Sequence, residues 1–336
     1  MTSVQSSAST GSTAPPEDRF RIPWGLMALG VVLIALPIFM DNIELRRITQ
    51  LIVLSLGVLG VSLATGYCGL ISLGHGAFVG IGAFAMATYV DNFGLPFLVA
   101  LPLVFVTGVI FGCVLGLPAL RIKGIYLALV TLGFALVFPS LAKRFPSITG
   151  GVSGRAVDAE LNPPEWTGLE PSQAMLWRYG FCVLVCFLLF WLTNNVINSR
   201  VGRSLQAVRD NETAAAVFGV NLVTAKVGAF GFSAGLAAMA GALQTILFPF
   251  VSHEQYDVFL SFRLYAAAVL GGLGTLVGAV YGVVALILVP RINDALHLLE
   301  NEVFVFGAGL ILLTYVSPDG LAGLIRRRGR RPTRQE

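Results

Sequence analysis

The sequence predicts an all-α protein, a polytopic transmembrane bundle of about 8–10 helices with a re-entrant segment near residues 262–275. The first observation behind this prediction is composition, because 56% of the 336 residues are hydrophobic and only 12% are charged. An ordinary globular domain carries about 25% charged residues. The second observation is that apolar runs recur along nearly the whole chain, which excludes a soluble domain behind a single signal peptide.

The apolar runs give the expected elements in order, since about 20 apolar residues are needed to cross a bilayer as a helix. Glycine interrupts the third run and the eighth run most heavily. The runs cover about 23–40, 48–65, 70–90, 95–118, 125–142, 177–196, 226–250, 262–290 and 302–316.

The polar segments between and around these runs set the domain organisation. Residues 1–18 are rich in Ser, Thr and Pro, and we expect this cytoplasmic segment to be disordered. A transmembrane domain follows over residues 19–324. Within it, a charged cytoplasmic loop covers 199–221, and a basic cytoplasmic tail over 325–336 ends the chain.

The positions of Lys and Arg predict the orientation, because loops rich in them stay in the cytoplasm. Arg121 and Lys123 lie between the fourth and fifth runs, the 199–221 loop holds three arginines, and the tail holds six. Arg46 and Arg47, in a segment expected outside, count mildly against this scheme. With both termini in the cytoplasm, the segments expected outside are 41–47, 91–94, 144–176 and 251–261.

The glycine-rich eighth run breaks the alternation unless it contains more than one element. A single crossing over 262–290 would place the basic tail outside. We therefore expect a half-helix over about 262–271, a turn at 271–274 and a full crossing over about 275–290. Broken backbone at membrane depth is tolerated only where protein buries it or water reaches it. The candidate lining of a solute pathway here is Gly271, Gly272, Gly274 and Thr275.

The third run holds the segment 72–78 (SLGHGAF), in which His75 is the one side chain that ionises near neutral pH. Such a residue at membrane depth faces a cavity or a partner, while small residues allow close helix packing. Both a packing role and a pathway role remain open for this segment. The polar and glycine candidates in the pathway are Ser72, Gly74, His75, Gly76, Tyr126 and Thr131.

The cytoplasmic loop is predicted to contain a short helix capped by Asp210 or Asn211, with Glu212 near its positive end. Gly219 is a natural stop for this helix. Its spacing places Ala214, Ala215 and Phe218 on one face. Such a face suits either insertion into a partner's groove or contact with this protein or lipid. From the residues alone, both alternatives stay open.

Several classes of function are disfavoured by what the sequence lacks. There is no GxxxxGK[ST] segment for a nucleotide phosphate, and no Cys/His spacing of a metal site. No paired carboxylates or Ser/His/Asp set converges in a run, so we expect no enzyme, no cofactor and no metal. The basic tail fits the cytoplasmic bias and contact with anionic lipid, and we expect no nucleic-acid partner.

Six segments, in this order, carry a resemblance to a known family. The chain resembles the membrane permease of the leucine/isoleucine/valine-type ABC importers from about residue 48 to Gly323. Any one of these segments is weakly specific, whereas the six in order are specific. The segments are 72–78 (SLGHGAF), 121–132 (RIKGIYLALVTL), 149–154 (TGGVSG), 202–212 (GRSLQAVRDNE), 271–275 (GGLGT) and 318–323 (PDGLAG).

The resemblance implies that the cytoplasmic loop couples the permease to an ATPase. Importers of this kind dock through an E-A-A-x-x-x-G pattern, and 213–219 keeps its spacing with Thr213 in the acidic position and Glu212 shifted by one. This favours docking over contact with lipid. The implied coupling residues are Arg203, Arg209, Glu212, Thr213, Ala214, Ala215, Phe218 and Gly219.

The resemblance also implies the partners and the solute. A second homologous permease, two ATP-binding subunits and an extracytoplasmic solute-binding protein would complete the transporter in the plasma (inner) membrane. The expected solute is a branched-chain or related neutral amino acid, and urea or a short amide is the alternative within the family. An ion-coupled secondary transporter is the rival class, and it usually needs acidic groups at mid-membrane. No Asp or Glu falls within the interior of a predicted run.

Overall fold

The structure is a computed structural model that describes residues 37, 40–117, 125–158, 161–164, 173–285, 320 and 321. The predicted runs at 23–40 and 302–316, the basic tail, and both Arg121 and Lys123 lie outside these described residues. The described part is an all-α bundle, as predicted. Its main helices are α2 (Asn42–Val61), α3 (His75–Ala87), α4 (Phe97–Gly116), α5 (Ile125–Arg144), α7 (Ala174–Asn198), α10 (Leu222–Leu247) and α11 (Val258–Gly271).

Shorter elements connect these helices. Two π-helices, η2 (Ser62–Tyr67) and η3 (Thr88–Asn92), extend α2 and α3. Within the described residues the strands form one antiparallel pair, in which Arg155 faces Val251. The remaining elements are α6 (Pro146–Thr149), η5 (Gly151–Ser153), β1 (Arg155–Ala156), α8 (Arg200–Asp210), α9 (Glu212–Val217), β2 (Phe250–Val251) and η8 (His253–Tyr256).

Five helices in the described part are long and apolar enough to cross a membrane. These five agree with the runs predicted from about 48, 95, 125, 177 and 226. The helix α3 is shorter, because it begins only at His75 after an irregular segment over 68–74. Helical backbone then continues through η3 to Asn92. The third run is therefore helical only from 75 on, later than predicted.

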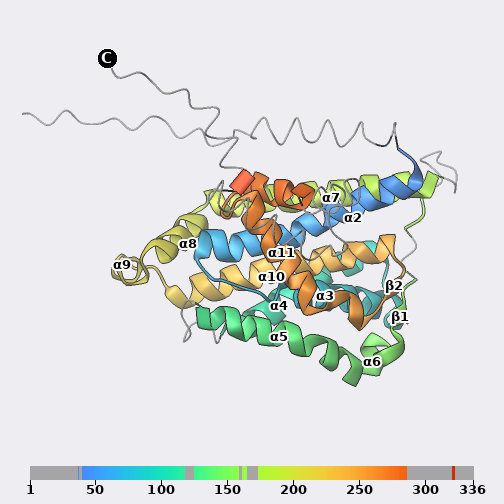
Figure 1. The fold of residues 1–336 in the computed structure, drawn as a ribbon, viewed down its shortest axis with the longest axis horizontal. Helices are drawn as coiled ribbons and strands as arrows, with labels where there is room; N and C mark the ends of the chain where they lie inside the picture. The colour runs from blue at the N-terminus through green and yellow to red at the C-terminus, as the bar shows by residue number, and fades with distance from the viewer. Residues whose placement is uncertain are drawn as a thin grey trace, which may run out of the picture.

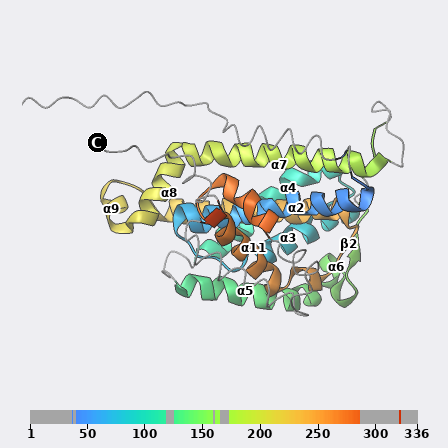
Figure 2. The same ribbon diagram turned by 45° about the horizontal axis from the view of Figure 1, so that its top comes forward.

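The helix α10 forms the centre of the bundle, packed against α2, α3 and α4. In its most apolar stretch 89% of the residues are buried, against 28% in α4 and in α7. Small residues allow this close approach, because Gly108 and Gly112 of α4 face Gly235 and Gly231 of α10. The helices α7 and α5 lie on opposite sides of the bundle in both views (Figures 1 and 2).

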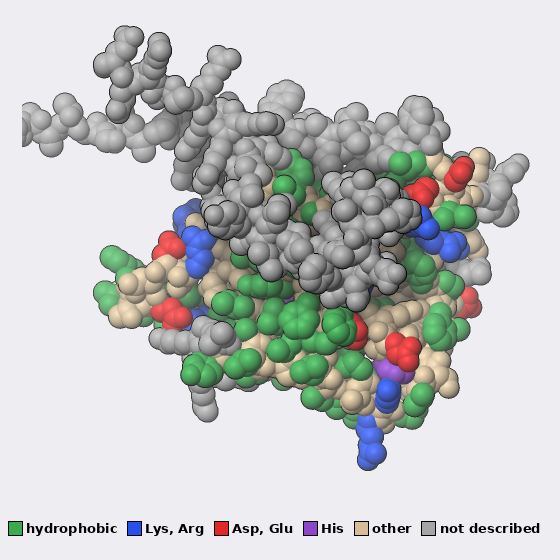
Figure 3. Space-filling model, viewed as in Figure 1, with side chains coloured by type: hydrophobic (Ala, Val, Ile, Leu, Met, Phe, Trp, Pro, Cys, Tyr) green, Lys and Arg blue, Asp and Glu red, His purple; other side chains and the backbone are tan. Residues whose placement is uncertain are grey.

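The outer faces of α4, α5 and α7 expose large apolar side chains, such as Ile110, Leu136 and Phe187. In water such faces would be unfavourable, whereas lipid or another apolar helix accommodates them. On the face drawn in Figure 3, charged side chains lie mostly toward the two ends of the molecule, with apolar side chains between them. This distribution is that of a membrane protein.

Two small apolar clusters mark the two ends of the bundle. At one end Leu45, Met175 and Leu247 meet, from the start of α2, the start of α7 and the end of α10. At the other end Tyr67 meets Ile197, where α2 and α7 finish. In Figure 1 the elements α8 and α9 project at this second end, and α6, β1 and β2 lie at the first. Segments predicted on opposite sides of the membrane therefore lie at opposite ends.

The predicted break in the eighth run is confirmed. The helix α11 ends at Gly271, and a second helix covers Leu276–Ala285. The two are bent by 117° across the break, so the run is not one straight crossing. Such a bend fits either a broken span or a re-entrant loop.

Candidate functional site

The irregular segment before α3 is stabilised by hydroxyl groups from two neighbouring helices. Backbone N–H groups at a helix start lack partners within the helix. The N–H of Leu73 donates to Thr131 Oγ1 of α5 at 2.9 Å, and the N–H of Gly76 donates to Ser261 Oγ of α11 at 2.9 Å. Non-helical backbone inside the bundle is thus hydrogen-bonded by protein, as membrane depth requires.

His75, the first residue of α3, connects this segment to the central helix. Its Nδ1 lies 3.0 Å from Ser72 Oγ, and its Nε2 lies 3.3 Å from Ser233 Oγ of α10. The Ser233 hydroxyl donates its proton to the carbonyl of Phe230 at 2.8 Å. The Nε2–H must therefore donate to Ser233, and Nδ1 accepts from Ser72. A neutral imidazole has both nitrogens satisfied in this arrangement.

We call this set of side chains the buried polar layer. Each member is at most 4% exposed. Two glycines let the hydroxyls approach the backbone: a Cβ at Gly74 would lie 2.8 Å from the carbonyl oxygen of Thr131, and a Cβ at Gly76 would lie 2.6 Å from Ser261 Oγ. The members of the layer are Ser72, His75, Thr131, Ser233 and Ser261.

Sequence reasoning identified part of this layer. The structure brings together the predicted Ser72, His75 and Thr131, whereas the predicted Tyr126 is 68% exposed on the outside of α5. We therefore remove Tyr126 from the layer. Ser233 was missed, although an isolated hydroxyl in the small-residue run of α10 could have indicated it.

The glycine break over 271–275 lies against the π-helix η2. Gly272 and Gly274 adopt left-handed backbone conformations, with φ values of 110° and 76°, which favour glycine. Thr275 Oγ1 donates to the carbonyl of Gly272 at 2.8 Å, and the N–H of Gly274 donates to Ser62 Oγ of η2 at 3.2 Å. The backbone at Gly271 is also tightly packed. These contacts give the break a defined shape.

The charged loop forms two short helices at the end of the bundle where α7 finishes. Ser199 caps α8 through the N–H of Val201 at 3.1 Å, and Asn211 caps α9 through the N–H of Ala214 at 3.0 Å. Gly219, with φ of 82°, ends this segment. The predicted start and stop of the short helix are confirmed.

The exposed face of α9 differs from the predicted one. Val217 and Phe218 are 81% and 86% exposed, and Ala214 is exposed beside them. Ala215 was predicted on this face but is buried at 3% exposure. Neighbouring residues on a helix point in directions about 100° apart. Ala215 can therefore face the protein while Ala214 faces outward. The apolar face available to a partner is therefore Ala214, Val217 and Phe218, with Thr213 exposed next to them.

Two charged coupling candidates point inward rather than outward. Glu212 Oε1 lies 2.8 Å from Lys226 Nζ at the start of α10, and the Lys226 side chain is only 4% exposed. Arg209 Nη1 donates to the carbonyl of Gly66 at 2.7 Å, whereas Arg203 is exposed on α8. Lys226 was missed by sequence reasoning, although it is the one charged residue in the sequence of α10.

A small pocket of about 150 Å³ lies between the loop and the bundle. Cys68, just beyond the first described span, lines it beside Glu212 and Lys226. Burial raises the pKa of the Cys68 thiol to about 12, against a smaller lowering by the Lys226 ammonium. This thiol is therefore protonated at neutral pH and is not a nucleophile. Among the described residues, no group of three His, Cys, Asp or Glu side chains could hold a metal.

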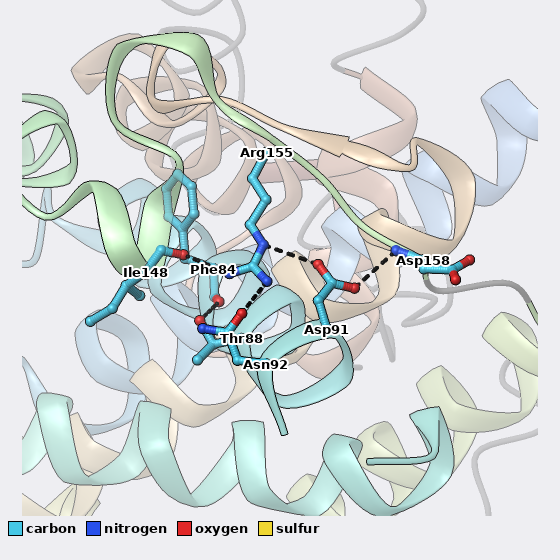
Figure 4. Close-up of polar contacts among 7 residues, drawn as sticks. All are labelled: Phe84, Thr88, Asp91, Asn92, Ile148, Arg155 and Asp158. Atoms are coloured by element: carbon cyan, nitrogen blue, oxygen red, sulfur yellow. Dashed lines mark hydrogen bonds and ion pairs between the residues drawn. The ribbon is translucent and has the colours of Figure 1, made fainter. Parts of the chain in front are cut away.

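At the opposite end of the bundle, Arg155 of β1 bonds to two side chains of η3 (Figure 4). Its Nε lies 3.0 Å from Asp91 Oδ2, and its guanidinium also donates to Asn92 Oδ1. The N–H of Asp158 donates to the second oxygen of Asp91 at 3.1 Å. These contacts connect η3, which extends α3, to the strand that pairs with β2. We call them the Arg155 cluster.

These features define the class of the protein, a multi-pass helical membrane protein with a buried polar layer and a short projecting helix, α9, with exposed apolar side chains. Residues 45–314 match the family described as the branched-chain amino acid transport system permease component. The chain belongs to that family of permeases.

Relatives with curated names agree with this assignment. The high-affinity branched-chain amino acid transport system permease protein LivM of Salmonella typhimurium is 30% identical, over 90% of this chain and 75% of its own length. LivM of Escherichia coli K12 is 29% identical over the same shares. The permease protein LivH of Escherichia coli K12 is 28% identical over 46% of this chain and 48% of its own length. No solved structure matches the chain significantly.

Proposed function

We propose that this chain is the permease subunit of an ABC importer that carries branched-chain or related neutral amino acids across the plasma membrane. The observation that supports it most is the family match over 45–314 combined with the exposed apolar face of α9. The solute is inferred from the names of the relatives. A neutral buried polar layer suits a solute without net charge, because it presents no fixed charge that would have to be neutralised.

The proposed assembly contains a second, homologous permease, which the similarity to LivH supports. Two ATP-binding subunits would dock on the exposed face of α9, whose apolar side chains suit a groove on a partner. A solute-binding protein would deliver the solute at the end that holds the Arg155 cluster. This places α8, α9 and both termini in the cytoplasm, in keeping with the distribution of Lys and Arg.

The proposed mechanism is alternating access driven by ATP hydrolysis on the partner subunits. Closure of the ATPases would move α9, and the helices joined to it would transmit this movement to the polar layer and the glycine break. Both elements contain non-helical backbone, which is tolerated in membranes where it lines a pathway or is buried by protein. Candidate pathway residues are therefore Ser72, His75 and Thr131, with Gly74, Gly76, Gly271, Gly272, Gly274 and Thr275.

The test is solute uptake by proteoliposomes that contain this chain, its permease partner, the ATPases and the binding protein. Radiolabelled leucine should accumulate only with ATP, and unlabelled valine should compete whereas urea should not. Competition by urea alone would assign the chain to the amide-transporting members of the family. Uptake by this chain alone, without ATP and with an ion gradient, would contradict the proposal and indicate a secondary transporter.

A further inference from the structure

Arg209 lies at the end of α8, beside α9, and its side chain, 43% exposed, lies against the end of η2. Its Nη1 donates to the carbonyl of Gly66 at 2.7 Å. Its aliphatic part covers Gly69, where an added Cβ would lie 3.1 Å from Arg209 Cγ. Asp210 Oδ1 accepts from both Nε and Nη2 at 3.1 Å, which fixes the plane of the guanidinium. Arg209 is therefore oriented toward the bundle.

Gly66 needs a donor from outside its own helix. It lies in the last turn of η2, where carbonyl groups have no partner within the helix. The carbonyls of Ala64 and Thr65 accept from Leu70 and Gly69, and the carbonyl of Gly66 accepts from Arg209. π-Helical turns are frequent at functional sites because they displace the following residues from the regular helix.

Gly66 also touches the glycine break. A Cβ at Gly66 would overlap the backbone of Gly274. The two segments can therefore meet here only because both residues are glycine. The N–H of Gly274 also donates to Ser62 Oγ, one turn earlier in η2. The residues Arg209, Gly66 and Gly274 thus form a continuous path from α8 through η2 to the break after α11.

We propose that Arg209 is a positioning residue. Its hydrogen bond fixes the position of Gly66, and through Gly66 that of the glycine break, relative to α9. This inference rests on the proposed function, since it describes how movement of α9 reaches the pathway. A chain of packed, hydrogen-bonded groups can carry such coupling if it has two discrete arrangements. In this proposal Arg209 acts through its hydrogen bond to the backbone of η2. The Glu212–Lys226 ion pair is a separate link, because it joins α9 to α10.

The first test uses the full-length chain alone in nanodiscs, so it does not depend on transport. Amide hydrogen exchange is followed for residues 64–70 and 271–276 in wild type, Arg209→Ala, Arg209→Lys and the control Arg203→Ala, which removes an exposed arginine from the same helix. We expect Arg209→Ala to raise the exchange rate at least about tenfold in both segments, because local opening would cost less free energy without this hydrogen bond. Arg209→Lys should give a smaller rise, and Arg203→Ala none.

The second test separates coupling from folding in the complete transporter. Arg209→Ala should keep solute-stimulated ATP hydrolysis within about twofold while uptake per ATP falls at least about fivefold. Unchanged exchange at 271–276 in Arg209→Ala would overturn the inference, as would an equal fall of uptake and hydrolysis in both Arg209→Ala and Arg209→Lys. If wild type shows no ATP-driven uptake, the proposed function fails, while the exchange result still decides whether Arg209 holds the break.

Discussion

Single hydroxyl groups make irregular backbone stable inside the bundle. Ser261 and Thr131 accept from backbone N–H groups near the start of α3, and Ser233 orders the ring of His75. The sequence could predict Ser72, His75 and Thr131, because polar residues stand out in apolar runs. It could not predict which hydroxyls meet, because Ser233 and Ser261 lie 158 and 185 residues from their partners.

The Glu212–Lys226 pair gives a prediction at this scale. Glu212→Ala leaves the buried Lys226 ammonium without its carboxylate, so we expect the free energy of unfolding to fall by about 3 kcal/mol. Adding Lys226→Met removes the unpaired charge and should restore most of that loss. Denaturant unfolding in detergent micelles measures both variants, with Glu254→Ala as the control because its side chain is 84% exposed. A double variant no more stable than Glu212→Ala would contradict this account.

The elements of the bundle depend on where helices are interrupted. The glycine break and its approximate position followed from counting charges on either side of the membrane, since one straight crossing would misplace the basic tail. The late start of α3 did not follow, because the third apolar run begins at about 70 whereas the helical backbone begins only at His75. Composition reports burial in lipid or protein, and it cannot show backbone conformation within an apolar run.

The central helix gives a prediction at the scale of elements. A Cβ at Gly241 of α10 would overlap the carbonyl oxygen of Val79 in α3, whereas a Cβ at Gly228 of the same helix meets nothing within 4 Å. Gly241→Ala should therefore lower the free energy of unfolding by roughly 3 kcal/mol. Gly228→Ala should be neutral or slightly stabilising. Thermal unfolding of the two purified variants measures the difference, and equal stability would show that α3 and α10 do not pack in this way.

The whole molecule has two chemically different ends. One end holds the Arg155 cluster and the β1–β2 pair, and the other holds α8 and α9. The sequence predicted this separation from the spacing of Lys and Arg, and the bundle places those loops accordingly. The sequence wrongly placed Ala215 on the exposed face of α9. So short a helix has no clear apolar periodicity, and its packing on the bundle decides which face is buried.

The orientation itself can be measured by cysteine labelling. In a background without the four native cysteines, Val152→Cys and Val201→Cys each place a thiol at a site that is more than half exposed and lies outside the apolar face of α9. A membrane-impermeant maleimide should label Val152→Cys in intact cells and Val201→Cys, in α8 next to α9, only after permeabilisation. The reversed pattern would place α9 outside and contradict docking on cytoplasmic ATPases.

The most direct test of the central claim is ATP-driven leucine uptake by the assembled transporter carrying Phe218→Glu. This change puts a charge at the centre of the exposed face of α9 without altering a buried contact of the chain, so folding should be unaffected. We predict that uptake falls at least about tenfold, because a charge buried in a docking groove costs more than about 1.4 kcal/mol. Val201→Glu, at an exposed apolar residue of the neighbouring helix α8, should leave uptake unchanged. Full uptake by Phe218→Glu would show that the exposed face of α9 does not couple this permease to the ATP-binding subunits.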